Sequence, residues 1–199
     1  MFDNSENNNQ KGTFGDNGTQ VFNDIDNYYT LNSEKSICHS ILVEIISVLS
    51  NNIELENIST PLGDKTKEKI QYNNLKRHRR RILHLYVQQM GSIDRAYKTV
   101  AETDGKFKPK NRIHLLLHNH FLKLLGTYDQ QNLNDDEIRK TKGDEILDKC
   151  IEYIVDKVTQ NIKSKDLIDE DIEPCCQLVV YEAFASCKVL FMPPKLQPK

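Results

Sequence analysis

The sequence predicts an all-α protein, an antiparallel bundle of five to six helices preceded by a disordered or strand-forming N-terminal arm. From residue 31 onward, apolar residues recur at three- and four-residue steps, which is the spacing of one helix face. No segment after residue 31 alternates apolar and polar residues as a strand does. The chain of 199 residues has no Trp, 8 Gly and 6 Pro, which is typical of a helix-rich globular protein. We expect an arm at residues 1–30, a helical domain at 31–194 and a short tail at 195–199.

The N-terminal arm begins with a polar, Asn-rich stretch whose apolar surface is too small to offset the entropy of ordering. A strand-prone segment follows at residues 15–29, where Gly, Asn and Asp favour turns and Thr, Val, Ile and Tyr favour extended backbone. Its polar side chains would form hydrogen-bonded ladders, and its apolar ones would interdigitate, when copies stack in register. The alternatives are a linker, an edge strand on the same chain, or addition to a partner's sheet edge. The predicted self-association residues are Thr19, Gln20, Val21 and Phe22.

The first helix is predicted to begin after a polar N-cap, Asn32 or Ser33, and to end near Ser50. Its apolar positions follow the helical period. They are Ile37, Ile41, Ile45, Val48 and Leu49.

Two further helices are predicted between a loop and a glycine break. The loop contains Pro61 and Gly63, and a long basic helix follows it and stops at Gly91. Ser92 is the expected N-cap of a short third helix, which breaks at Gly105.

The last three helices are punctuated by prolines and acidic caps. The fourth follows Pro109, and its unusually wide apolar arc predicts that it is the central helix of the core. The fifth begins at Asp135 or Asp136 and runs for nearly eight turns. The sixth starts near Pro174, which is tolerated in a first turn, and stops before Pro193.

The charge of the chain is balanced overall and uneven locally. With 27 Lys and Arg against 29 Asp and Glu, the net charge of −2 argues against a polyanion-binding role for the chain as a whole. Residues 65–81 are strongly basic, however, while residues 129–173 carry 14 acidic and 7 basic residues. Such polarity is expected to orient a partner or a second copy of the chain.

Cysteine usage and hydropathy predict the compartment. The chain has no signal-peptide pattern and no apolar run near the roughly 18 residues that a membrane span needs, so we expect a cytoplasmic protein that does not bind membranes. The cysteines are odd in number, have no CxxC spacing and lie beside apolar residues, which predicts buried, reduced thiols. They are Cys38, Cys150, Cys175, Cys176 and Cys187.

The basic run at residues 77–81 has two interpretations. Five consecutive helical residues point almost all round the helix, so at most two or three share one face. The first interpretation is a solvated face that pairs with the acidic fifth helix or with a partner, and the second is contact with a nucleic-acid backbone. The candidate nucleic-acid or acidic-partner contacts are Lys76, Arg77, Arg80 and Arg81.

No reaction motif accompanies these features. His114 and His118 lie one helical turn apart, but the sequence lacks an HExxH pattern, and His120 points off their face by roughly 160 to 200°. Paired carboxylates lie at predicted helix starts, where they stabilise the helix dipole. The sequence therefore predicts no enzyme, no catalytic residue, no metal and no cofactor.

Two stretches carry a family resemblance. Residues 69–75 (KIQYNNL) and 181–194 (YEAFASCKVLFMPP) resemble the C-terminal domain found in proteins of bacterial ABC-three-component systems. That family consists of predicted anti-phage conflict systems with an ABC-type ATPase, a small middle component and a third protein. In the third protein, a helical domain of this kind usually follows an effector such as a protease or nuclease. The resemblance would cover residues 31–194 and implies an antiviral defence role.

The arm carries a second resemblance. Residues 15–23 (GDNGTQVFN) resemble bacterial amyloid-signalling motifs related to the RIP homotypic interaction motif, whose kernel has a Gln between strand-forming residues. This chain departs from the pattern because no Gly follows Phe22. No effector domain precedes the helical part within these 199 residues, so the resemblance implies docking and self-association instead of an effector activity.

These observations favour a non-enzymatic adaptor or regulatory subunit of a bacterial defence system. Its helical domain would dock a protein partner, such as an ABC-type ATPase or an effector component, and its arm would make it a homo-oligomer. The alternative function is a nucleic-acid-binding module that uses the basic helix around residues 76–81.

Overall fold

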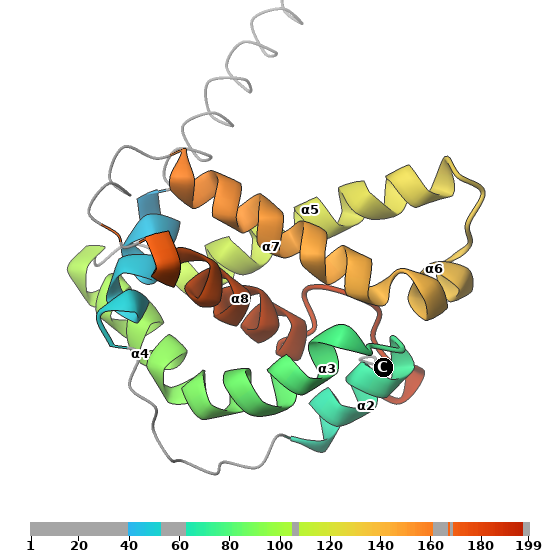
Figure 1. Ribbon diagram of the computed structural model, residues 1–199, viewed down its shortest axis with the longest axis horizontal. Coiled ribbons are helices and arrows are strands. Elements are labelled where there is room, and N and C mark those ends of the chain that lie inside the picture. The colour runs from blue at the N-terminus through green and yellow to red at the C-terminus, as the bar shows by residue number, and fades with distance from the viewer. Residues whose placement is uncertain (1–39, 53–62, 105–107, 161–166, 168, 197–199) are drawn as a thin grey trace, which may run out of the picture. The chain divides into compact units, whose positions relative to one another are not determined.

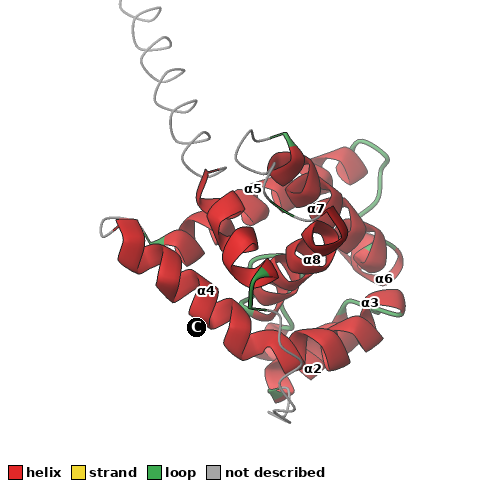
Figure 2. Ribbon diagram, turned by 60° about the vertical axis from the view of Figure 1, so that its left-hand side comes forward, coloured by secondary structure: helices red, strands yellow, loops and turns green. Residues whose placement is uncertain are grey.

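The computed structural model describes residues 40–52, 63–104, 108–160, 167 and 169–196, which belong to the second of two units, Ile37–Lys199. Every regular element in these ranges is a helix and none is a strand, which confirms the all-α prediction (Figure 2). The predicted arm, including residues 19–22, lies outside the described residues, as does the predicted start of the first helix.

The elements follow one another along the chain with short connections (Figure 1). They are a helix at residues 40–50, α2 (Asp64–Tyr72), α3 (Arg77–Arg81), the π-helical segment η1 (Ile82–Tyr86), α4 (Val87–Asp104), α5 (Pro109–Asp129), α6 (Asp135–Thr141), α7 (Gly143–Thr159), α8 (Asp169–Ala185) and the 3-10 turn η3 (Pro194–Leu196). The first helix ends at residue 50, α4 ends at Asp104 and α5 begins at Pro109, as predicted.

The central helix is α8, not α5 as the wide apolar arc had indicated. Every residue from 175 to 184 is buried, and α8 contacts α4, α5, α7 and η1. A helix that is apolar on nearly all sides is stable only when other elements surround it. The breadth of the α5 arc has a different cause, because Ile113, Leu117 and Phe121 are buried while Leu115 and Leu122 face outward.

The long basic helix predicted to end at Gly91 is wrong in two places. It is interrupted after Tyr72, where Asn74 adopts a left-handed φ of 50°, and α3 restarts with a cap supplied by another helix. The carboxylate of Asp144 on α7 accepts hydrogen bonds from the backbone N–H groups of residues 76, 77 and 78, at 3.1 to 3.2 Å. A carboxylate at a helix start satisfies donors and stabilises the dipole, so a distant residue determines where α3 begins.

The helix then continues through Gly91, and Ser92 does not cap a new one. A glycine inside a helix costs about 1 kcal/mol relative to Ala. The residues that follow are buried at helical spacing, which offsets that cost. They are Ser92, Ile93, Ala96, Tyr97 and Val100.

The predicted eight-turn fifth helix is two helices, α6 and α7. The cap of α6 is Asn134, which accepts from the N–H of Glu137 while the Glu137 side chain accepts from the Asn134 N–H, a capping box. The break falls at Gly143, where a Cβ atom would lie 2.5 Å from the backbone oxygen of Asn73. This close approach requires glycine and brings the start of α7 onto the loop between α2 and α3.

The last helix also differs from its predicted bounds. It begins at Asp169, so that Pro174 lies inside it, and it ends at Ala185 well before Pro193. Beyond it, Cys187 has a φ of 60°, and Lys188 N–H donates to the Ala183 carbonyl at 2.9 Å. This is the hydrogen-bond pattern of a helix end that usually has glycine at the left-handed position.

Candidate functional site

A buried lysine joins α2 to the end of α8. The Lys69 Nζ donates to the backbone oxygens of Phe184 and Val189, both at 2.7 Å, and lies 4.5 Å from the centre of the Phe184 ring. Only 1% of Lys69 is exposed, and burial lowers the pKa of its ammonium group to about 8. The lysine therefore ties together segments more than 100 residues apart in the sequence.

Asn73 holds the segment that follows α8. Its Oδ1 accepts from the Phe191 N–H at 3.1 Å, and its Nδ2 donates to the Phe191 carbonyl at 2.8 Å. The amide thus pairs with both backbone groups of one residue. With Lys69, this contact brings residues 69–75 against residues 184–191, so the two stretches that carry the family resemblance form one structural unit.

A second polar cluster surrounds Glu182 on α8. Its carboxylate accepts hydrogen bonds from His114 Nε2, from Lys110 Nζ at 2.8 Å and from Ser186 Oγ at 2.8 Å. Burial by itself would raise the pKa of Glu182, but the hydrogen bonds and charges of His114 and Lys110 bring it below its usual value. The cluster links α5 to α8.

A third cluster connects α3, α7 and α8. The His78 Nε2–H donates to the Asp148 carboxylate at 2.9 Å, and His78 Nδ1 contacts the Tyr181 hydroxyl at 2.8 Å. Since a carboxylate accepts only, the hydroxyl is the donor to Nδ1 when the imidazole is neutral. Arg77 pairs with the same Asp148. The acidic helix thus neutralises part of the basic run, as one of the two interpretations predicted.

The three histidines considered as metal ligands have separate surroundings. His114 bonds to Glu182, His118 Nδ1 lies 2.9 Å from the Lys188 carbonyl, and His120 stacks on Tyr153 with ring centres 4.0 Å apart. Among the residues that the structure describes, no group of three or more His, Cys, Asp or Glu side chains is placed to hold a metal ion.

The described cysteines are free thiols, and Cys38 lies outside the described ranges. Cys150, Cys175 and Cys176 are buried, as predicted, and burial raises the pKa of Cys150 and of Cys175 to about 12. Cys187, at the left-handed position after α8, is only partly buried.

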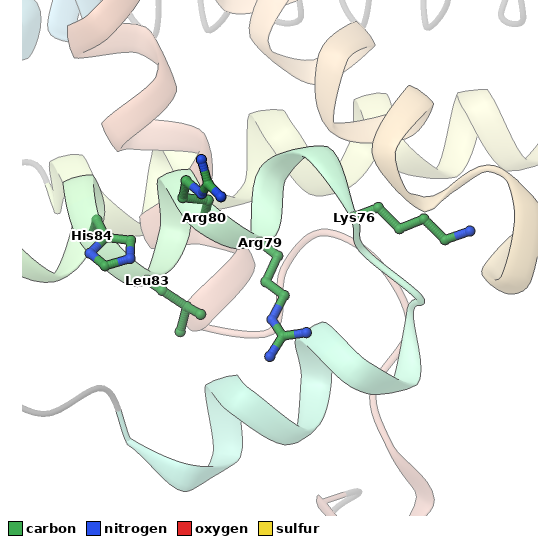
Figure 3. A pocket seen from close by; sticks show the side chains of 5 residues that line it. All are labelled: Lys76, Arg79, Arg80, Leu83 and His84. Atoms are coloured by element: carbon green, nitrogen blue, oxygen red, sulfur yellow. The ribbon is translucent and has the colours of Figure 1, made fainter.

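The rest of the basic run forms an open surface, which we call the basic face. It consists of Lys76, Arg79, Arg80, Leu83 and His84, which line a cavity of about 350 Å³ (Figure 3). All except the half-buried Leu83 are exposed.

The basic face contains only two of the four predicted contacts, Lys76 and Arg80. Arg77 pairs with Asp148, and Arg81 hydrogen-bonds to Tyr181. Sequence reasoning missed Arg79 and His84, although the spacing of helical residues that share a face would have found them.

A second open surface lies on α5 and the end of α8, and we call it the α5 face. Leu115 is 59% exposed and Leu122 is 49% exposed, and they are the large apolar side chains that stand out as exposed in the described part of the chain. A cavity of about 480 Å³ lies beside them. It is lined by Asn111, His114, Leu115, His118, Cys187 and Lys188.

A comparison of the chain with protein-family models, with the curated proteins and with the solved structures found no match. Among the described helices, none is both long enough and apolar enough to cross a membrane.

Proposed function

We propose that this chain is a non-enzymatic adaptor of a bacterial defence system, which docks a partner protein through the α5 face and self-associates through its N-terminal arm. The observation that carries the proposal is the exposure of Leu115 and Leu122 on one side of α5. Large apolar side chains that gather beside a hollow on a soluble domain are typical of protein-binding sites.

The geometry of the α5 face fits an amphipathic helix of the partner. Leu115 and Leu122 are seven residues apart, so they lie on the same stripe and about 10.5 Å from each other along the axis, at 1.5 Å per residue. This spans two turns of a partner helix, whose apolar side chains at i and i+7 would cover the two leucines and enter the adjoining cavity.

The rim of the α5 face indicates the charge of that partner helix. Lys123 and Lys188 are exposed beside the leucines, and His118 and Asn111 lie on the same stripe. A partner helix with acidic residues beside its apolar stripe is therefore complementary. The resemblance of residues 69–75 and 181–194 to the ABC-three-component domain makes the other components of such a system, the ABC-type ATPase above all, the partners to test first.

The interior polar clusters are consistent with a binding role. Lys69, His78 and Glu182 each use their polar atoms to join helices that are distant in the sequence. Buried groups engaged in this way fix the relative positions of helices. A rigid bundle is the scaffold that a pre-organised docking surface requires.

Docking is tested by co-expressing the chain with the proteins encoded beside its gene and measuring complex mass by light scattering after size-exclusion chromatography. We expect a complex that the double substitution Leu115→Glu/Leu122→Glu weakens at least tenfold. The matched control, Gln88→Glu/Thr99→Glu on exposed positions of α4, adds the same charge and should leave the complex intact. A complex insensitive to both double substitutions would contradict docking through the α5 face.

Self-association is tested separately, by light scattering of the full chain and of a chain that begins at Leu31. The full chain is expected to form an oligomer or filament that becomes monomeric without the arm, because stacked strands pair their backbones and interdigitate Val21 and Phe22. Gln20→Ala and Phe22→Ala should reduce the assembly in the full chain. A monomer in both lengths would reject this part of the proposal.

A further inference from the structure

We propose that the basic face binds the phosphate backbone of nucleic acid through Lys76, Arg79 and Arg80. This inference goes beyond the adaptor function and uses elements separate from the α5 face. Its test and the docking test can therefore fail independently.

The first argument is helical register. Residues 76, 79, 80, 83 and 84 follow the spacing i, i+3, i+4, i+7 and i+8, so they share one side of the rod formed by α3 and η1. Arg77 and His78 point to Asp148 on α7 instead. Folding thus sorts a consecutive basic run into charges that hold the bundle together and charges that face outward.

The second argument is that the outward charges keep their full strength. Asp144 is occupied by the backbone N–H groups at the start of α3, and Asp148 is occupied by Arg77 and His78. Within the described ranges, no carboxylate forms an ion pair with the side chain of Lys76, Arg79 or Arg80. Such a group of exposed cations attracts a polyanion through counterion release.

The third argument concerns the shape of the ligand. In Figure 3 the side chain of Arg79 extends toward α2, Arg80 points away from it, and Lys76 extends from the start of α3. The cations fan out along the rod and do not converge on one point. This arrangement suits successive phosphates of an extended chain better than a single small anion, which needs convergent donors.

The composition of the face distinguishes nucleic acid from an acidic protein. Protein interfaces have an apolar centre with aromatic or other large anchors. The only apolar side chain that lines this cavity is Leu83, and none of the lining residues is Tyr, Phe or Trp. Phosphate backbones are bound by cations without such a centre, and the guanidinium groups of Arg79 and Arg80 match phosphate geometry.

The test is fluorescence anisotropy of a labelled 20-mer, as a duplex and as a single strand, titrated with the full chain at 50 to 200 mM salt. Three phosphate contacts predict a log–log salt slope of about −2.7 for the duplex, so affinity falls about 40-fold over this range. In Lys76→Gln/Arg79→Gln/Arg80→Gln, we expect at least tenfold weaker binding at 50 mM salt and a slope near zero. Lys98→Gln/Lys123→Gln/Lys195→Gln removes three exposed charges elsewhere and should retain the slope.

Three results would overturn the proposal. The first is no binding of either 20-mer by the wild type at 50 mM salt. The second is an equal loss of binding in the two triple variants, which would assign binding to net charge alone. The third is capture of a polyglutamate peptide without capture of nucleic acid, which would assign the face to an acidic protein. Circular dichroism melting of both variants verifies that each one is folded.

Discussion

Replacing Lys69 by Ala is expected to lower the free energy of unfolding by about 2 to 4 kcal/mol. The substitution leaves the carbonyls of Phe184 and Val189 buried without a donor, at about 1 to 3 kcal/mol each. It also removes buried methylene groups worth about 0.8 kcal/mol each. Relief of the buried charge offsets part of this loss, because lowering the pKa to about 8 corresponds to about 3 kcal/mol. Urea unfolding monitored by circular dichroism measures the difference.

The same lysine predicts a pH dependence with a definite sign. Between pH 8 and 10.5 the folded chain releases the Lys69 proton while the unfolded chain retains it, so stability from this group rises with pH. The advantage of the wild type over Lys69→Ala should therefore grow from pH 7 to pH 10, by at most about 1.4 kcal/mol per pH unit. Lys65→Ala, on an exposed position of the same helix, is the control and should change stability little at any pH. A difference between wild type and Lys69→Ala that stays below about 1 kcal/mol throughout would show that the lysine does not hold the end of α8.

Replacing Glu182 by Ala is expected to have the larger effect, about 3 to 5 kcal/mol. Removing one partner of a buried ion pair leaves the other charge uncompensated, and Glu182 serves His114, Lys110 and Ser186 at once. The melting temperature should fall by at least about 6 °C, at roughly 2 °C per kcal/mol for a chain of this size. Glu173→Ala, an exposed glutamate on the same helix, is the matched control.

The acid limb of stability supplies the second measurement on Glu182. Its pKa is lower in the folded chain than in the unfolded chain, so its contribution is present above the ordinary glutamate pKa and is lost as pH falls through the folded value. The difference in unfolding free energy between the wild type and Glu182→Gln should therefore shrink as pH falls from 5 to 3. A difference that is constant over this range would mean that the carboxylate charge is not what stabilises the cluster.

The sequence allowed prediction of features that depend on local chemistry. Pro109 starts a helix because its missing N–H is not needed in a first turn, and the helix that precedes it ends at Asp104, next to Gly105, where a break was expected. The helical period also placed Ile41, Ile45 and Leu49 in the core. These features require no knowledge of what lies opposite.

Features that depend on distant partners could not be predicted in the same way. The break before α3 is stabilised by Asp144, 66 to 68 residues further along the chain, and the burial of Lys69 depends on carbonyls 115 and 120 residues away. No local pattern distinguishes Lys69 from the exposed Lys65 and Lys67. The basic face was only half identified for the same reason, since Arg77 and Arg79 differ in what faces them and not in residue type.

The π-helical segment η1 sets the rotational phase between the two halves of one continuous rod. A π-turn holds more residues than an α-turn, so the side chains of α4 are rotated about the axis relative to those of α3. Deleting a single residue within Ile82–Tyr86 would change that phase by about 100°, the angle per residue of an α-helix. If the buried stripe of α4 kept its place against α8, Arg79 and Arg80 would turn to a different side of the molecule. The length of this one turn therefore determines the direction in which the basic face points.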